Sequence, residues 1–289
     1  MVGILAAGAY VPRLRLQRSA AAKANAWLAP GLMGKAGGER AMANWDEDAV
    51  TMAVEAARDL LGPDDDRSHV NALFLASTTL PFADRLNAGI VAAALTLEPR
   101  TFATDVTGSQ KAGLTALAQA LCMAEGNAGF RGLVAAADKR RAKAASTQEL
   151  DWGDGAAAMM VGQGDTIADW IGGATHTADF VDHFRSVGQV FDYQWEERWI
   201  RDEGFGKLVP PVIAQALASA GVEAGAVDHF ILPSTFKGVA DGLAKKAGIR
   251  PEAVRDNLAA SVGETGCAHA LLMLAHALET AKAGEIILV

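Results

Sequence analysis

The feature that most constrains the fold is a regular alternation of short apolar runs with longer segments of helical periodicity. In the first half of the chain, the predicted strands lie at residues 70–76, 101–106 and 132–137, and the predicted helices at 46–61, 84–97 and 110–124. Strands that alternate with helices in this way predict an α/β protein with a mostly parallel sheet covered by helices.

The same order of elements recurs in the second half. Helices are predicted at residues 207–220, 236–247 and 266–283, and strands at 227–232, 257–262 and 285–289. A repeat of this kind predicts two similar halves related by a pseudo-twofold axis. The first half continues through Gly153 and Gly155 into a further strand at 156–161, whereas the pattern of the second half stops at Val289. We therefore expect the second half to lack its last loop and strand.

These patterns divide the chain into three parts. Residues 1–163 form the predicted N-terminal half, residues 164–206 an inserted segment, and residues 207–289 the C-terminal half. The inserted segment carries a dense aromatic and charged stretch at 191–202. Aromatic side chains are enriched at protein interfaces, so we expect this stretch to pack over the core or at a dimer interface.

Charge and composition exclude several classes of protein. The 289-residue chain is 51% hydrophobic, carries a formal charge of -8 and contains no basic run, which argues against a nucleic-acid or anionic-membrane surface. It begins without the basic region of a signal peptide, and no apolar run approaches the roughly 20 residues of a membrane span. A cytoplasmic protein with no membrane segment is the expectation.

Cysteine and histidine spacing predicts neither disulfides nor a metal site. Cys122 and Cys267 form no CxxC pair, and His176 and His183 are among six scattered histidines without metal-ligand spacing. Cys122 is predicted to lie in the middle of a helix and in the hydrophobic core of the protein. Cys267 is interpreted as a small buried residue, since free cysteine is often buried.

Four segments, spread in order over the whole chain, carry a resemblance to a known family. They are residues 3–13, 45–53, 105–113 and 153–158. Together they resemble the thiolase superfamily, above all the prokaryotic 3-hydroxy-3-methylglutaryl-CoA synthases and ketoacyl synthase III. The resemblance implies a thiolase fold, in which duplicated α-β-α halves give five layers, αβαβα.

The resemblance also implies where a nucleophile would lie. In the family, a cysteine at a strand-to-helix elbow takes the acyl group from CoA, and the end of a helix lowers the pKa of such a thiol and stabilises an oxyanion. Residues 105–113 align with this elbow and put Gln110 at the cysteine position, whereas an alignment slipped by one residue puts Ser109 there. Glutamine cannot form an acyl-enzyme.

The other positions that carry condensation chemistry in the family are changed as well. Its histidine motif falls at residues 230–235, which contain no histidine, and His229 lies earlier, where a strand would bury it. Glu264 stands at the family's asparagine and Thr78 at its glutamate base. Some polar residues of these motifs are interpreted as structural turn or strand-end residues: Asp105, Asp154 and Thr78.

Our first hypothesis is an enzyme that acts on C–C bonds of CoA thioesters without a covalent intermediate. Gln110 and the N–H groups at the start of its helix would hold a thioester carbonyl or enolate oxygen, while Glu264 would move a proton. Lys111 and Gly263 would line the pocket for the CoA thioester. Relatives that carry glutamine in place of cysteine, or work without the nucleophile, make decarboxylation, retro-aldol cleavage or aldol-type condensation admissible.

Two alternatives remain open at this point. One is a non-catalytic or regulatory subunit that binds acyl-CoA or pairs with a competent thiolase-fold partner. The other is a conventional acyltransferase that uses Ser109 or Cys267. The resemblance implies a homodimer or a heteromer with a thiolase-fold subunit, and a zinc-ribbon/OB-fold module as a further domain or partner.

Overall fold

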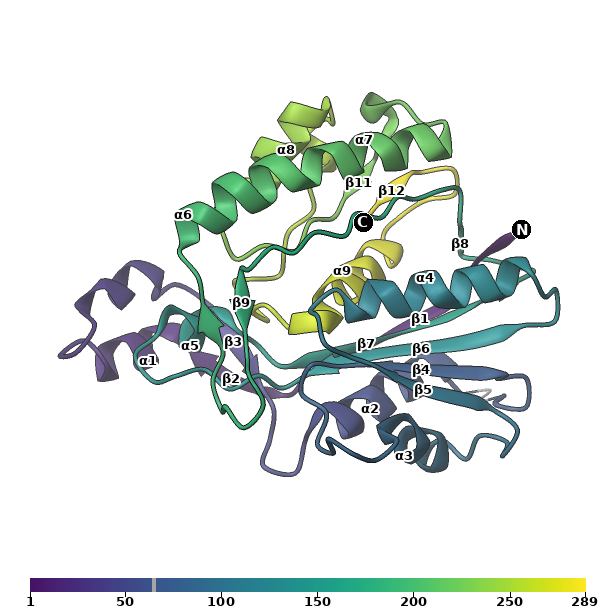
Figure 1. Ribbon diagram of the computed structural model, residues 1–289, viewed down its shortest axis with the longest axis horizontal. Coiled ribbons are helices and arrows are strands. Elements are labelled where there is room, and N and C mark those ends of the chain that lie inside the picture. The colour runs from purple at the N-terminus through teal and green to yellow at the C-terminus, as the bar shows by residue number, and fades with distance from the viewer. Residues whose placement is uncertain (64–65) are drawn as a thin grey trace. The chain divides into compact units, whose positions relative to one another are not determined.

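A six-stranded sheet forms the centre of the first of two units (Figure 1). The structure is a computed structural model that describes residues 1–63 and 66–289. The first unit contains residues 1–140, 144–170 and 258–280, and the second contains residues 141–143, 171–257 and 281–289. Each unit is therefore assembled from stretches that are far apart in the sequence.

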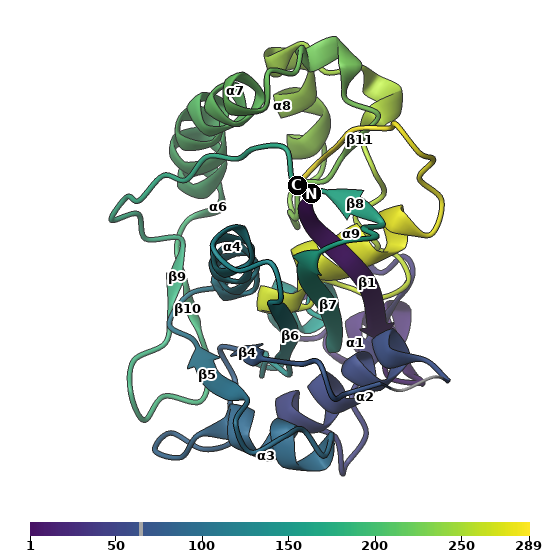
Figure 2. The ribbon, with the colours of Figure 1, turned by 90° about the vertical axis from the view of Figure 1, so that its right-hand side faces the viewer.

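The strands of the large sheet lie in the order β5-β4-β6-β7-β1-β8 (Figure 2). Their bounds are β1 Val2–Tyr10, β4 Ala72–Ala76, β5 Phe102–Val106, β6 Arg131–Asp138, β7 Gly155–Gln163 and β8 Ala168–Asp169. β4 is parallel to β5 and β6, whereas β7 is antiparallel to β6 and β1, and β8 is antiparallel to β1. Most strands thus run in one direction, as predicted, and β7 and β8 run in the opposite one.

Helices cover both faces of this sheet (Figures 1 and 2). α2 (Ala49–Leu61) and α3 (Asn87–Ala94) pack on one face, and α4 (Ala112–Glu125) and α9 (His269–Leu278) pack on the other. The first unit is therefore a three-layered α-β-α arrangement. The predicted helices over 46–61, 84–97 and 110–124 are all present, with later starts.

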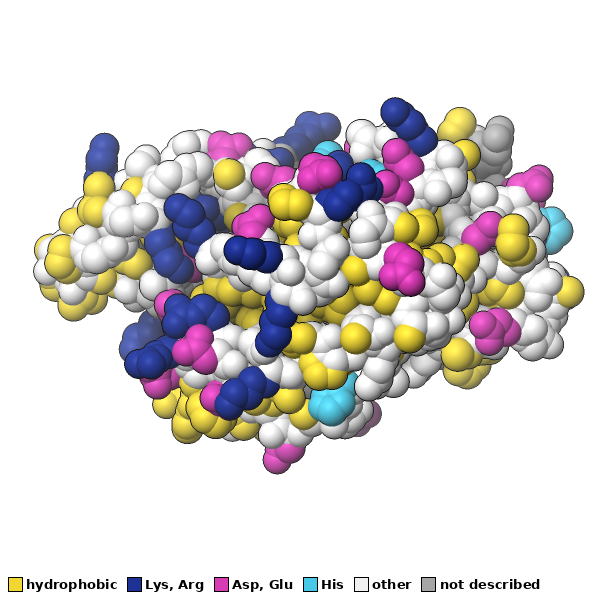
Figure 3. Space-filling model, turned by 90° about the horizontal axis from the view of Figure 1, so that it is seen from above, with side chains coloured by type: hydrophobic (Ala, Val, Ile, Leu, Met, Phe, Trp, Pro, Cys, Tyr) yellow, Lys and Arg dark blue, Asp and Glu magenta, His cyan; other side chains and the backbone are white. Residues whose placement is uncertain are grey.

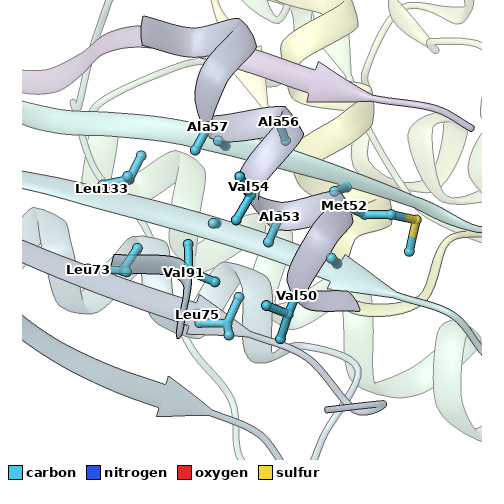
Figure 4. Close-up of a cluster of buried hydrophobic side chains, with 14 of the residues drawn as sticks. Val50, Met52, Ala53, Val54, Ala56, Ala57, Leu73, Leu75, Val91 and Leu133 are labelled. Atoms are coloured by element: carbon cyan, nitrogen blue, oxygen red, sulfur yellow. The ribbon is translucent and has the colours of Figure 1, made fainter. Parts of the chain in front are cut away.

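The core between α2 and the sheet consists of small and medium apolar side chains (Figure 4). Val50 and Val54 from α2 pack toward Leu73 and Leu75 of β4. Burial of one such side chain stabilises the fold by roughly 1.5–3 kcal/mol. Asp48 caps this helix, because its carboxylate accepts the N–H of Thr51 at 2.8 Å.

A small subregion of the first unit adds a hairpin. β2 (Leu14–Gln17) and β3 (Glu39–Met42) are antiparallel, and α1 (Arg18–Ala24) and the 3-10 helix η1 (Pro30–Lys35) lie between them in the chain. Their apolar residues pack with Leu150 of α5 (Thr147–Asp151).

The strand predicted at 257–262 is wrong. These residues form turns, Leu258 has a φ of 57°, and the carbonyl of Leu258 accepts the N–H of Val262 at 2.9 Å. The segment still pairs locally, because Glu39 and Ala41 of β3 donate their N–H groups to Ala260 and Val262. The segment thus bonds to β3 as a turn instead of forming a strand of its own, and Val262 is buried whereas Ala260 and Ser261 are exposed.

The second unit contains shorter strands. Its elements are β9 (His183–Phe184), β10 (Tyr193–Gln194), α6 (Glu197–Trp199), the π-helix η2 (Ile200–Leu208), α7 (Val209–Ala220), β11 (His229–Phe230), α8 (Val239–Ala247), β12 (Ile287–Leu288) and 3-10 turns at Ala224–Ala226 and Pro251–Ala253. β11 and β12 form a parallel pair, and they are two-residue parts of the strands predicted at 227–232 and 285–289. Ile213, Val227 and Phe230 form its apolar core.

The inserted segment divides between the units. β8 joins the large sheet, whereas β9 and β10 form a hairpin of the second unit, in which the rings of Phe184 and Tyr193 lie 5.1 Å apart. Several aromatic side chains here are about half exposed, among them Trp195 and Trp199. Their predicted place at a dimer interface stays a prediction.

Across residues 1–63 and 66–289, no helix combines the length and apolar character needed to cross a membrane. On the face seen in Figure 3, Lys and Arg side chains lie among Asp and Glu. This mixture agrees with the absence of a basic run in the sequence.

Candidate functional site

Polar residues follow the carboxyl ends of three parallel strands of the first unit. Ser77 follows β4, Ser109 and Gln110 lie just beyond β5, and Arg140 lies just beyond β6. In open α/β sheets, ligands bind outside the carboxyl ends of the strands. We therefore take this edge as the candidate site.

The elbow after β5 is a tight turn. Gly108 has a φ of 89°, the hydroxyl of Ser109 accepts the N–H of Lys111 at 3.3 Å, and the first helical residue is Ala112. Ser109 and Lys111 are exposed and Gln110 is half-buried. Gln110 thus lies two residues before the start of α4.

A close backbone approach joins this elbow to a segment from the other end of the sequence. A Cβ at Gly113 would lie 2.2 Å from the carbonyl oxygen of Cys267, so only glycine fits in the first turn of α4. Cys267 belongs to the 3-10 helix η5 (Gly266–Ala268), three residues after Glu264. The structure therefore brings the elbow and the Glu264 loop into one region.

The two cysteines occupy opposite environments. Cys267 is 2% exposed, its thiol donates to the carbonyl of Ala76 at 3.3 Å, and burial, with the nearby Asp138 carboxylate, raises its pKa well above the ordinary value. Cys122 is exposed, so its predicted core position is wrong. The buried face of α4 carries residues 120, 121 and 124, which turns position 122 outward.

Asp138, at the end of β6, is fully buried and connects three elements. Its carboxylate accepts the Ser77 hydroxyl at 3.0 Å, the Thr78 N–H at 2.8 Å, the Thr79 hydroxyl at 2.9 Å and the Cys267 N–H at 2.8 Å. The Thr78 hydroxyl also lies 3.0 Å from this carboxylate. These bonds support the structural interpretation of Thr78.

Arg140 and Glu264 form an ion pair at this edge. The side chains are 2% and 13% exposed, and the guanidinium lies 3.9 Å from the centre of the Trp152 ring. Arg140 also donates to the main-chain oxygen of Glu264 at 3.3 Å. The other carboxylate oxygen of Glu264 accepts the N–H of Gly266 at 2.8 Å, so the carboxylate is held from two sides.

The main chain of Glu264 is fixed by the segment before β7. Its N–H donates to the main-chain carbonyl of Asp151 at 2.8 Å, and its own carbonyl accepts the N–H of Gly153 at 2.9 Å. A Cβ at Gly153 would lie 1.9 Å from the carbonyl oxygen of Val262, so only glycine allows the two backbones to approach this closely.

Two aspartates near the site serve as main-chain acceptors. Asp154 accepts the N–H of Ala43 at 2.8 Å, and burial raises the pKa of its carboxyl group. Asp105 accepts the N–H groups of Asn87 and Ala88 at 2.9 and 2.7 Å, and thereby caps α3. Both arrangements support the structural roles predicted for them.

His229 belongs to the second unit. It is 6% exposed, as predicted, and its Nε2 lies 2.9 Å from Glu285, a hydrogen bond that lowers the pKa of Glu285. In the described part of the chain, no group of three His, Cys, Asp or Glu side chains is arranged to hold a metal ion.

Sequence reasoning missed Asp138, Arg140 and Trp152. The first two follow the predicted strand 132–137, so the strand-end rule was the signal that could have found them. The partner of Arg140 lies 124 positions away, and neither periodicity nor spacing indicates such a pair.

No family model matches this chain. Hydroxymethylglutaryl-CoA synthase from Picrophilus torridus is 27% identical over 296 residues, which cover all of this chain and 83% of the relative.

Solved structures show the same fold. OleA from Xanthomonas campestris matches with a TM-score of 0.85 at 19% identity over 98% of this chain and 91% of that one. The 3-oxoacyl-(acyl carrier protein) synthase III FabH from Pseudomonas aeruginosa matches with a TM-score of 0.82 at 21% identity over 96% and 89%.

Proposed function

We propose that this chain, which is similar to hydroxymethylglutaryl-CoA synthases and shares the fold of FabH and OleA, is a thiolase-superfamily enzyme that acts on C–C bonds of CoA thioesters without a cysteine acyl-enzyme. The observation that carries this proposal is the elbow. It presents Ser109 and Gln110, while one cysteine is buried against Ala76 and the other lies on the outer face of α4.

Decarboxylation, retro-aldol cleavage and aldol condensation of thioesters share an enolate, whose negative charge resides largely on the thioester oxygen. The proposed site offers neutral donors for that oxygen, namely the Gln110 amide and N–H groups at the start of α4. Glu264 is the proposed group for proton transfer. Each carboxylate oxygen has two lone pairs, so the bonds to Arg140 and Gly266 leave acceptor capacity.

A conventional acyltransferase has less support. The Cys267 thiol is buried and its pKa is raised, whereas a nucleophilic thiol needs exposure and a lowered pKa. The Ser109 hydroxyl caps the N–H of Lys111, and general-base activation of a serine requires a neighbouring base.

One observation favours the second candidate, a non-catalytic subunit. Both oxygens of the Glu264 carboxylate take part in local bonds, as in a structural ion pair. In that case, Glu264 would stabilise its loop and the chain would bind acyl-CoA or pair with a catalytic thiolase-fold partner.

Calorimetry with acetyl-CoA and CoA tests the shared premise. We expect saturable binding, and no binding would refute both the enzyme and the ligand-binding subunit. Intact-mass spectrometry after incubation with acyl-CoA should show no acyl adduct, and an adduct on Ser109 or Cys267 would establish the acyltransferase instead.

Variants separate the remaining two candidates. Gln110→Ala should reduce turnover of acyl-CoA about 100- to 1,000-fold, as the loss of one oxyanion donor does. Glu264→Gln should reduce it by a similar factor. Exposed residues supply matched controls, Gln189→Ala for the first and Glu55→Gln for the second, and both should leave turnover unchanged. Equal rates in all variants would exclude the roles assigned here.

A further inference from the structure

We infer that Arg140 is a positioning residue that keeps Glu264 ionised and aimed, which makes Glu264 a proton acceptor in the resting site. The inference rests on the proposed function, in which Glu264 transfers a proton. It adds that Glu264 works as an ionised carboxylate, and this protonation state indicates the class of substrate.

The first step is the rigidity of the guanidinium. Arg140 leaves the end of β6 with its side chain 2% exposed and stacks on Trp152, 3.9 Å from the ring centre. It then bonds both the carboxylate and the main-chain oxygen of Glu264. A planar fork that is stacked on one face and bonded at its edge has little freedom to turn, so it fixes the carboxylate as well.

The second step is the balance of charges around Glu264. The charged and titratable groups near Glu264 include Arg140, just beyond β6, and Asp138, whose carboxylate accepts the N–H of Cys267. They also include the buried Asp154, on which Arg140 acts, and the buried His269, which bonds to Thr265. The two aspartates oppose a further negative charge nearby. Arg140 is the cation in contact with Glu264, and an opposite charge in contact favours the charged form of a carboxyl group.

The ionised state of Glu264 limits the reactions in which it can take part. An ionised carboxylate accepts a proton, whereas decarboxylation needs no base. The ion pair therefore points to β-hydroxyacyl thioesters, or to thioesters with an enolisable α-carbon, as substrates. In cleavage, Glu264 takes the β-hydroxyl proton and the Cα–Cβ bond breaks. The electron pair of the broken bond forms the enolate, and a carbonyl compound leaves. Glu264 then returns the proton to Cα.

Nuclear magnetic resonance of the free protein tests the ion pair without any substrate. In protein labelled with carbon-13 at glutamate side-chain carboxyls, the Glu264 signal is identified by its loss in Glu264→Gln. We expect Arg140→Gln to raise the titration midpoint of this signal by about one pH unit or more. Arg140→Lys keeps the charge without the fork and should raise it less.

The exposed pair of Arg58 and Glu55 on α2 supplies the control, and Arg58→Gln should leave the Glu264 midpoint unchanged. An unchanged midpoint in folded Arg140→Gln would overturn the inference. If that variant does not fold, an unchanged midpoint in Arg140→Lys would overturn it equally.

Turnover provides the second readout. With β-hydroxyacyl-CoA as the probe, the acid limb of the rate profile of Arg140→Gln should move to higher pH by the same shift, with the basic limb fixed. A uniform loss of rate at every pH, without a shift of the acid limb, would show that Arg140 is structural and would contradict the inference. Absence of turnover in the wild type would refute the proposed function alone, because the resonance titration judges the ion pair independently.

Discussion

The elbow after β5 and the loop over residues 258–267 meet at the same edge of the sheet but are held in different ways. The elbow is closed by local bonds, such as those from Lys111 and Ala112 to Ser109. The loop is bonded to β3, to the end of α5 and to β6. One segment is fixed by its own turn and the other by its neighbours.

This difference separates two kinds of site residue. A side chain on the elbow can change with little effect on the rest of the unit, so substitutions at Gln110 should alter chemistry more than stability. Glu264 takes part in the bonds that hold its loop, so its substitution should alter both.

The anchored segment should shield its cysteine. At pH 8 we expect a thiol reagent such as iodoacetamide to modify Cys122 roughly 100-fold faster than Cys267, because a thiol that is buried with a raised pKa supplies little thiolate. Peptide mass spectrometry measures both rates. In urea the two rates should converge, whereas rapid modification of native Cys267 would revive the acyltransferase alternative.

Asp138 should be the largest single contributor to the stability of the loop. Asp138→Asn places an amide among hydroxyl and N–H donors, and we expect the free energy of unfolding to fall by about 3 kcal/mol. Urea denaturation measures this change.

The matched control is Asp105→Asn. Asp105 also lies at a strand end and accepts several bonds, but it caps α3 and does not bond to the 258–267 loop. We expect a smaller loss, near 1 kcal/mol. Equal losses would mean that the bonds of Asp138 to the 258–267 loop contribute no more to the free energy of unfolding than the cap of α3.

How far the sequence predicts this molecule follows from the range of the interactions. Apolar periodicity and the glycine and proline residues that end helices and strands are local signals, so they located β6, α2 and α4 to within a few residues. The strand at 257–262 was mispredicted because an apolar run does not specify its hydrogen-bond partners, and here the segment forms turns that accept N–H groups of β3.

The site divides in the same way. The elbow could be predicted because its turn, its glycine and its helix lie within ten residues of one another. The ion pair of Arg140 and Glu264 could not, because it depends on tertiary packing that brings β6 beside the loop. Cys122 shows that even local periodicity fails where a helix is apolar on more than one side.

Two glycines of the elbow region differ in whether they contact the loop: Gly113 lies against Cys267, and Gly108 has no such neighbour. Gly113→Ala would push α4 away from Cys267, and we expect a loss of about 3 kcal/mol in the free energy of unfolding, because a Cβ 2.2 Å from a carbonyl oxygen forces the backbone to move. Gly108→Ala meets no neighbour and bears only the strain of a positive φ, about 1 kcal/mol. Thermal unfolding ranks the two, and the reverse order would contradict the contrast drawn above.

The smallest effect concerns a second anchor of the first unit, the bond from the Tyr10 hydroxyl to Glu47. This bond raises the pKa of Tyr10 from 10.0 to about 12, so its contribution to stability is complete below pH 10 and is lost as pH rises to 12. Tyr10→Phe should therefore flatten the fall in stability over this interval, as measured by urea denaturation at constant ionic strength. Tyr193→Phe, at the other and more exposed tyrosine, should leave the fall intact. If the two variants show the same fall in stability, the bond from Tyr10 to Glu47 does not contribute to the pH dependence of stability.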